Sequence, residues 1–481
     1  MTGQVASSVL WSLVRNWGSR LAGFLVYFQL VRLLTPQELG LFAAAFAALA
    51  FLEIFVDQGV GVALVQRKEV NDKVISTAFF VNLGIALLIV AGVALFAGYF
   101  EDVMNISGLK AVVLVSSAAL ILNAMSMCQE SMAKRGFRFK QLAARQLTGT
   151  LVGGAIGIAM AFNGFGVWAM VAQFIITALV NLIYITWTER VNLRAGFSMA
   201  EARQLVSFGA NILGVRLIEF WSTRGVELLI GAWIGAVALG VFSVGAKLYF
   251  LLYTILGSAL VDVAYSVFSR MRGEHEQLLN AYFKSMATAA MVVAPIWALL
   301  SAAAPEVTLL AFGDRWSAAA QVLSWLAVLG AVQLIQRFDT ALLTSLGHPR
   351  LPLLLSGVRA GVAVLACYLC REASLDVFVM TFVLMQMLTA PFSVMVVKSR
   401  TGASFKRAGS AVVWPLLGCA AAWLAHRQTH DLLSSSGHGS FVALLVVPCL
   451  VFGLVYLAVM ALFRRDQLKT LKADLASLRG K

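Results

Sequence analysis

Long apolar segments follow one another along almost the whole chain and are separated by short polar loops. A helix needs roughly 20 apolar residues to cross a bilayer, whereas a strand of a membrane barrel needs only about ten. The segment lengths therefore predict an all-α polytopic membrane protein with about fourteen transmembrane helices. The expected spans are residues 9–34, 41–60, 74–98, 109–133, 142–162, 166–188, 206–234, 236–262, 284–304, 318–345, 351–370, 376–397, 409–426 and 440–463.

One expected span, residues 206–234, carries ionisable side chains in its middle: Arg216, Glu219, Arg224 and Glu227. Each would cost about 2.5–3.5 kcal/mol at the centre of a spanning helix, so four facing lipid would cost roughly ten or more. At about 100° per residue, Arg216, Glu219 and Glu227 share one arc, and Arg224 flanks it. We predict that this polar stripe lines a cavity enclosed by protein.

Two interpretations of the stripe are open. The charges form i,i+3 ion pairs that neutralise each other inside a helix bundle, or they contact a substrate or a coupling ion. The first two spans raise the same choice. Arg15 and Arg20 either line the cavity or extend to the headgroups. Glu53 and Asp57 either neutralise these arginines or bind a proton or sodium ion.

The 481 residues are 60% hydrophobic and only 12% charged, with a net charge of +14. The cations gather in alternate loops, and one such loop is expected to carry Lys134, Arg135, Arg138, Lys140 and Arg145. Because cytoplasmic loops are enriched in Lys and Arg, this asymmetry predicts that both termini are cytoplasmic. We therefore attribute the positive charge to membrane topology and expect no nucleic-acid partner.

The loops are too short for a soluble catalytic domain, so we expect no enzyme activity. The sequence contains neither a phosphate-binding Walker motif nor an HExxH zinc motif. The five cysteines lie in apolar segments, where packing is their expected role. We expect no metal and no cofactor other than a coupling ion, H+ or Na+.

A short motif recurs at an offset of 200 residues, as LGLF at 39–42 and LGVF at 239–242. Each copy follows a span with intramembrane arginines and opens the next span. This repetition predicts two pseudo-symmetric six-helix halves with a site between them. The expected divisions are 1–200 for helices 1–6, 201–400 for helices 7–12, and 401–481 for two C-terminal helices and a basic cytoplasmic tail.

The first and seventh spans together carry more arginines than glutamates. Arginine presents a fork of donors that stays charged and binds phosphate through two hydrogen bonds. An anionic, phosphate-bearing substrate is therefore expected, and the acidic groups favour a counter-transported cation. The candidate substrate-binding residues are Arg15, Arg20, Arg216 and Arg224, and the candidate ion-coupling residues are Glu227, Glu219, Asp57 and Glu53.

Several motifs, in order from the first to the eleventh span, resemble the polysaccharide-export branch of the multidrug/oligosaccharidyl-lipid/polysaccharide (MOP) exporter superfamily. The resemblance is to Wzx-type flippases, and most closely to their colanic-acid-exporter-like subfamily. The motifs are LLTPQELG at 33–40, DQGVGVALVQRK at 57–68, KRGFRFK at 134–140, GFGVWA at 164–169, FGDRW at 312–316 and SLGHP at 345–349.

This resemblance implies a MATE-like fold and a flippase of the bacterial inner membrane. It would move undecaprenyl-pyrophosphate-linked oligosaccharide to the periplasmic leaflet for exopolysaccharide or O-antigen synthesis. Glu227 stands where the family typically has an aspartate, and Phe242 where it often has a tyrosine. Membrane lipid and a polysaccharide polymerase or co-polymerase are further expected partners.

Two other classes share parts of this pattern. A multidrug exporter of the same superfamily would need a negative, aromatic cavity for organic cations, whereas the stripes here carry a positive excess. A membrane polysaccharide polymerase or ligase would generally need a substantial periplasmic loop, and the loops here are short.

Overall fold

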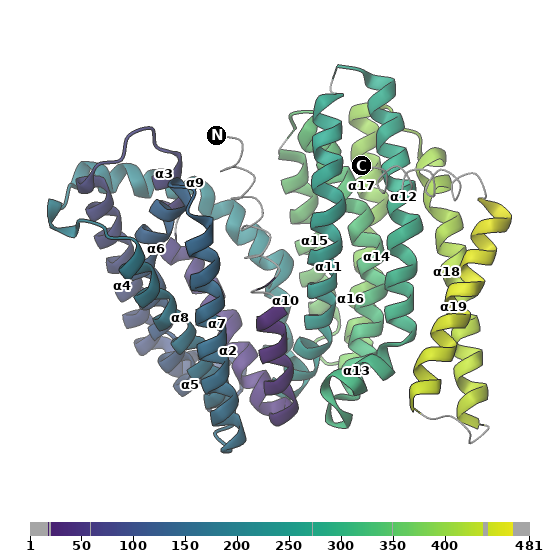
Figure 1. The fold of residues 1–481 in the computed structure, drawn as a ribbon, viewed down its shortest axis with the longest axis horizontal. Helices are drawn as coiled ribbons and strands as arrows, with labels where there is room; N and C mark the ends of the chain where they lie inside the picture. Colours follow the sequence, from purple (N-terminus) through teal and green to yellow (C-terminus); the bar gives the residue numbers. More distant parts are fainter. Residues whose placement is uncertain are drawn as a thin grey trace. The chain divides into compact units, whose positions relative to one another are not determined.

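The computed structural model describes residues 18, 21–57, 59–271, 273–348, 350–435 and 441–464. In this part of the chain every regular element is a helix, and no strand occurs (Figure 1). The prediction of an all-α protein is therefore confirmed.

Within the described residues, eleven helices are long and apolar enough to cross a membrane. They correspond to eleven of the expected spans, which confirms a multi-pass membrane protein but not the count of fourteen. Of the first expected span, Leu21–Leu33 forms a shorter apolar helix. The expected span 142–162 lies within a helix, Phe139–Phe162, that is not among the eleven because glycines and polar residues reduce its apolar character. The expected span 206–234 is interrupted.

The chain divides into two compact units, Met1–Ser243 and Val244–Lys481. This division does not test the predicted boundaries of the sequence repeats, which stay a prediction. The helices of the first unit are α2 (Pro36–Asp57), α3 (Val60–Gln66), α4 (Asp72–Met104), α5 (Leu109–Ser116), α6 (Ala118–Arg135), α7 (Phe139–Phe162), α8 (Val167–Thr188), the 3-10 helix η1 (Leu193–Ala195), α9 (Met199–Thr223) and α10 (Gly225–Trp233).

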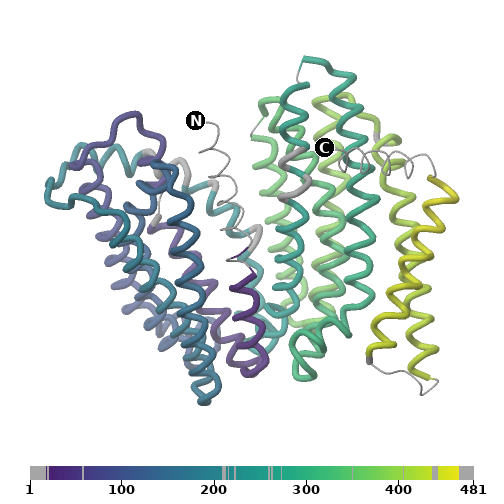
Figure 2. The backbone as a smooth tube through the Cα atoms, viewed as in Figure 1, coloured from purple at the N-terminus to yellow at the C-terminus, as the bar shows by residue number. Residues whose placement is uncertain are grey.

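Helix α11 (Ala236–Arg270) carries the chain from the first unit into the second, as the colours of Figure 2 show. In the second unit α18 and α19 lie side by side, and α12 lies against α14. The helices of this unit are α12 (His275–Ala302), α13 (Ala304–Phe312), the 3-10 helix η2 (Asp314–Trp316), α14 (Ala318–Ser345), α15 (Arg350–Leu369), α16 (Leu375–Met387), α17 (Thr389–Thr401), α18 (Phe405–Ser435) and α19 (Phe441–Phe463).

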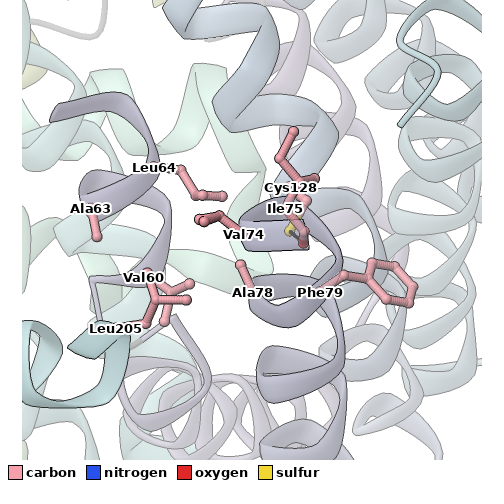
Figure 3. Packing of buried hydrophobic residues seen from close by; sticks show 9 residues of the cluster. All are labelled: Val60, Ala63, Leu64, Val74, Ile75, Ala78, Phe79, Cys128 and Leu205. Atoms are coloured by element: carbon pink, nitrogen blue, oxygen red, sulfur yellow. Dashed lines mark hydrogen bonds between the residues drawn. The ribbon is translucent and has the colours of Figure 1, made fainter. Parts of the chain in front are cut away.

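A buried apolar cluster fixes the short helix α3 to its neighbours (Figure 3). Val60 and Leu64 on α3 are fully buried, and Cys128 on α6 belongs to the same cluster. Leu205 attaches the start of α9 to it. This packing holds α3, α4, α6 and α9 together around the end of the first unit where the chain turns from α3 into α4.

Three cation-rich loops lie at that same end of the first unit. The Arg135 guanidinium at the end of α6 donates hydrogen bonds to the carbonyls of Leu64 and Lys68, which flank the loop after α3. Arg67 forms an ion pair with Glu201, in the first turn of α9, at 2.6 Å, and Asn192 in the loop before α9 donates a hydrogen bond to Asp72. Loops that the sequence assigns to one side of the membrane are thus linked to one another.

Glycines on α7 allow α8 to approach closely. A Cβ atom at Gly149, Gly153 or Gly157 would lie less than 3.0 Å from atoms of α8. These glycines repeat every four residues and therefore line one face of the helix. Helices α7 and α8 accordingly lie side by side (Figure 1).

The repeated LGxF motifs contact each other reciprocally. A Cβ atom at Gly40, in α2, would clash with the backbone carbonyl of Ala236, and a Cβ atom at Gly240, in α11, would clash with the carbonyl of Pro36. The contacting positions are therefore related by the same offset of 200 residues as the motifs. Only glycine leaves room for the two helix starts to cross this closely.

We expect Gly40→Ala and Gly240→Ala each to lower the melting temperature of the purified protein, because overpacking against a backbone typically costs about 1–3 kcal/mol. Gly84→Ala in α4 is the matched control, since nothing lies within 4 Å of a Cβ atom there and alanine favours the helix. Thermal unfolding in detergent, followed by loss of the monodisperse protein, measures the difference. Equal melting temperatures for all three variants would contradict the proposed close crossing.

Candidate functional site

The expected continuous helix over 206–234 is wrong, because it is interrupted at Arg224. Helix α9 ends at Thr223 and α10 begins at Gly225. The backbone of Arg224 leaves the ideal helical conformation, with φ −117° and ψ −18°. The ring of Trp221 lies where a Cβ atom at Gly225 would be. Glycine at this position lets the ring pack against the interruption.

Arg224 and Glu227 form the i,i+3 ion pair that the sequence predicted as one alternative, with 3.5 Å between nitrogen and oxygen. Glu227 is buried in the first turn of α10, where the helix dipole favours a negative charge. The Arg224 guanidinium also lies 5.0 Å from the centre of the Phe46 ring on α2. This pair therefore has a structural role, while 43% of the Arg224 side chain stays exposed.

A pocket of about 730 Å³ lies within the first unit. It includes two of the predicted site residues, Arg216 and Glu53, on α9 and α2. Glu53 accepts a hydrogen bond of 3.1 Å from Asn123 on α6. The residues around the pocket are Ala50, Glu53, Ile54, Val56, Gly61, Val62, Val65, Gln66, Asn82, Leu120, Asn123, Ala124, Ser126, Met127, Glu130, Ser131, Lys134, Arg145, Gln146, Asn181 and Arg216.

An ion-pair cluster that the sequence analysis missed forms one wall of this pocket. The carboxylate of Glu130 on α6 pairs with Lys134 at 2.8 Å and with Arg145 on α7 at 2.6 Å. The expectation that Arg145 lies in a cytoplasmic loop is wrong. Arg145 lies in α7, which begins at Phe139, and its side chain is buried. The sequence feature that could have indicated this cluster is the run of polar residues around Glu130 in an otherwise apolar helix. Only the fold shows that Glu130 contacts Arg145.

The pocket is positively charged on balance. Its charged residues are Lys134, Arg145 and Arg216 against Glu53 and Glu130. One carboxylate, that of Glu130, is shared by two cations. A pocket with this charge balance favours anionic or hydrogen-bonding ligands over cations.

The other predicted site residues fall into two groups. Glu219 lies on α9 with an exposed side chain, and Asp57 ends α2, although its side chain is outside the described residues. Arg15 and Arg20 lie outside the described residues. The structure thus brings Arg216 and Glu53 to one pocket and joins Arg224 to Glu227.

The second unit contains a separate buried polar cluster. Tyr282 on α12 donates a hydrogen bond of 2.7 Å to Asp339 on α14, and Ser393 on α17 donates to the other carboxylate oxygen. Gln386 on α16 donates to the backbone carbonyl of Arg359 on α15. Both oxygens of the Asp339 carboxylate are therefore bonded within the protein, which makes this cluster a link between helices.

The helices are arranged as in solved membrane transporters. The structure is similar to the lipid II flippase MurJ in its inward closed conformation, with a TM-score of 0.72 and 13% identity, over 96% of this chain and 100% of that chain. It is also similar to an inward-facing multidrug resistance MATE family transporter of the MOP superfamily, with a TM-score of 0.59 and 18% identity, over 82% and 98% of the two chains. The protein therefore has the fold of this class of transporter.

Residues 29–321 match the model of the family described as polysaccharide biosynthesis protein, and the chain belongs to this family. This confirms the resemblance inferred from the motifs. Among similar proteins, the succinoglycan biosynthesis transport protein ExoT of Rhizobium meliloti (strain 1021) is 25% identical over 67% of this chain. The lipopolysaccharide biosynthesis protein WzxC of Escherichia coli (strain K12) is 21% identical over 69% of it. The aligned region spans 66% of the length of each relative. The fold is therefore one that solved transporters share, and the family is that of polysaccharide biosynthesis proteins.

The ion-pair cluster makes a prediction about stability. Glu130→Gln removes the carboxylate that pairs with the buried Arg145 guanidinium, and we expect a loss of about 1–3 kcal/mol, below the cost of a fully buried pair because Glu130 is partly exposed. Lys134→Gln is the matched comparison, since Lys134 is the more exposed partner. Its effect on the melting temperature should be clearly smaller. A larger loss for Lys134→Gln than for Glu130→Gln would contradict this assignment.

Proposed function

We propose that this protein is an inner-membrane flippase that moves undecaprenyl-pyrophosphate-linked oligosaccharide repeat units to the periplasmic leaflet. The observation that carries the proposal is the surplus of cationic groups around the pocket of the first unit, at Lys134, Arg145 and Arg216. Family membership and the transporter fold support it. So do the names of its relatives, which concern the biosynthesis of several bacterial polysaccharides.

In the proposed mechanism the pyrophosphate pairs with the arginines of the first and seventh expected spans, while the polyprenyl chain stays in lipid. Guanidinium groups suit this role because they stay charged and bind phosphate oxygens in pairs. The candidates are Arg15, Arg20, Arg216 and Arg224. The exposed part of the Arg224 side chain gives a phosphate oxygen access without breaking its contact with Glu227.

A coupling ion would bias the exchange between inward- and outward-facing states. Such an ion acts only through a difference in its affinity for the two states. Glu227 is the first candidate, because its carboxylate is buried at an interrupted helix, as ion sites of transporters often are. Glu219, Asp57 and Glu53 are further candidates, and either H+ or Na+ fits a carboxylate site.

The orientation in the membrane belongs to the same proposal. The linked loops around Arg67, Arg135 and Glu201 carry many cations, and the positive-inside rule assigns such loops to the cytoplasm. Both termini would then be cytoplasmic. A polysaccharide polymerase or co-polymerase would receive the flipped repeat unit.

The pocket does not favour the multidrug alternative. Among the described residues around it, none is aromatic and the charge is positive on balance. Pockets for drug-like organic molecules are mostly apolar and aromatic, and an organic cation would be repelled by the surplus charge.

Reconstitution tests the proposal directly. Liposomes containing the purified protein and fluorescent undecaprenyl-pyrophosphate oligosaccharide are treated with a membrane-impermeant reagent that reaches only the outer leaflet. We expect the protein to increase the rate at which labelled lipid becomes accessible. A longer glycan without any change of leaflet would indicate a polymerase, and no change in rate would contradict the flippase proposal.

We expect Arg216→Ala and Arg224→Ala each to reduce this rate about tenfold or more. A charged hydrogen bond is worth about 1.5–3 kcal/mol, and about 1.4 kcal/mol corresponds to a factor of ten. Arg371→Ala is the matched control, because this exposed arginine pairs only with its sequence neighbour Glu372 among the ion pairs of the described residues. Full activity of both stripe variants at normal protein levels would refute the proposed arginine site.

We expect Glu227→Gln to abolish stimulation of flipping by a proton or sodium gradient while slow exchange without a gradient continues. The amide keeps the size of the side chain but neither ionises nor holds a cation as strongly. Glu372→Gln, at an exposed position, should leave gradient stimulation unchanged. Gradient stimulation that persists in Glu227→Gln would move the coupling role to another carboxylate.

A further inference from the structure

The pocket of the first unit is surrounded by side-chain amides as well as charges. The amides come from α3, α4, α6, α7 and α8, so five separate helices each present one. They are Gln66, Asn82, Asn123, Gln146 and Asn181. Each amide offers two N–H donors and a carbonyl acceptor. The pocket wall therefore combines hydrogen-bond donors and acceptors from five helices.

Several buried polar atoms in this wall have no hydrogen-bond partner within the described part of the chain. They are Nε and Nη1 of Arg145 and the carbonyl oxygens of Asn82 and Asn181. The Arg145 side chain is only 8% exposed. An unpaired buried group of this kind costs about 1–3 kcal/mol. A small side-chain rotation toward the pocket would let a ligand recover part of that cost.

The unpaired atoms include both hydrogen-bond donors and acceptors, which restricts the chemical class of ligand that can satisfy them. A metal cation would satisfy the two amide oxygens but meets a positive surplus from Lys134, Arg145 and Arg216. Inorganic phosphate would satisfy the Arg145 nitrogens but leave the oxygens of Asn82 and Asn181 unpaired. A ligand rich in hydroxyl groups satisfies both, because each hydroxyl donates one hydrogen bond and accepts others.

The pocket also has suitable dimensions. Its volume of about 730 Å³ lies within the usual range of roughly 300–1,000 Å³ for small-ligand sites. Along α6 its lining extends from Lys134 to Leu120, which is roughly 21 Å at 1.5 Å per residue. This is about two thirds of a hydrocarbon core of roughly 30 Å. A hydroxyl-rich group bound there would be shielded from lipid inside the first unit.

We propose that this pocket binds a sugar residue of the lipid-linked glycan. The inference rests on the proposed flippase function and adds to it a position for the glycan that is separate from the pyrophosphate site. Arg216, which belongs both to the arginine stripe and to the pocket lining, connects the two sites. The Glu130–Arg145 ion pair orients the wall against which the sugar lies.

Binding measurements with two kinds of lipid test this inference. The wild-type protein in nanodiscs is titrated with undecaprenyl pyrophosphate alone and with undecaprenyl pyrophosphate carrying one hexose, one N-acetylhexosamine or one hexuronic acid. We expect at least one sugar-bearing lipid to bind about tenfold more tightly than the bare lipid, the effect of one or two additional hydrogen bonds. Equal affinities for all four lipids would overturn the pocket assignment while leaving the flippase proposal intact.

Substitutions in the pocket lining test whether the preference for sugar-bearing lipid arises in this pocket. Gln146→Leu removes an exposed amide from the pocket lining and should reduce the preference for the sugar-bearing lipid to less than threefold without changing the affinity for the bare lipid. Asn123→Leu on α6 is a second variant of the lining, and it also removes the hydrogen bond that Asn123 donates to Glu53. The matched control is Gln141→Leu, on the same helix as Gln146 but not among the residues around the pocket, and it should retain the preference.

The remaining outcomes separate this inference from the flippase proposal. If Gln146→Leu and Asn123→Leu weaken binding of both kinds of lipid equally, the side chains support the fold and the sugar assignment is wrong. If the wild-type protein binds neither kind of lipid, the flippase proposal fails, and the sugar assignment fails with it.

Discussion

Enclosing charge inside a membrane-spanning protein is the constraint on which the first unit depends. The Arg145 guanidinium would be costly in lipid, and it is accommodated because Glu130 supplies a carboxylate 2.6 Å away. That pairing requires α6 and α7 to keep a fixed position along each other. Gly149, Gly153 and Gly157 continue the four-residue spacing from Arg145 along the same face of α7, and they let α8 pack closely there. One ion pair and one line of glycines therefore determine where the pocket wall lies.

The interruption at Arg224 follows from the same constraint. A continuous helix over 206–234 would hold Glu227 in mid-helix, where no backbone amide is available to it. Ending α9 at Thr223 places Glu227 in the first turn of α10, where the helix dipole stabilises its negative charge. Arg224 then pairs with Glu227 and contacts the Phe46 ring. The two alternatives predicted for the stripe are thus not exclusive, since a structural pair can stand beside a substrate site.

The sequence predicted the all-α membrane fold well, because the length of apolar segments is a local property that lipid imposes directly. It also indicated the repeat at Gly40 and Gly240, although only the crossing of α2 and α11 explains why glycine is required there. The pocket was partly missed. Arg145 looked like a loop cation because hydropathy does not reveal that Glu130, fifteen residues earlier, reaches it. Glu53 and Arg216 were identified, but their meeting in one pocket depends on packing between α2 and α9.

Recognition of the substrate need not follow the repeat symmetry. In the first unit two nitrogens of the Arg145 guanidinium, in a pocket wall, have no hydrogen-bond partner among the residues that the structure describes. In the second unit both oxygens of the Asp339 carboxylate are bonded by Tyr282 and Ser393. A polar group whose hydrogen bonds are all formed within the protein stabilises helix contacts but gains little free energy from a ligand. A buried group with an unpaired donor or acceptor can form the missing hydrogen bond with a ligand. The pocket wall of the first unit, in which these polar atoms are unpaired among the described residues, therefore has the chemistry to select a glycan, and the Asp339 cluster of the second unit does not.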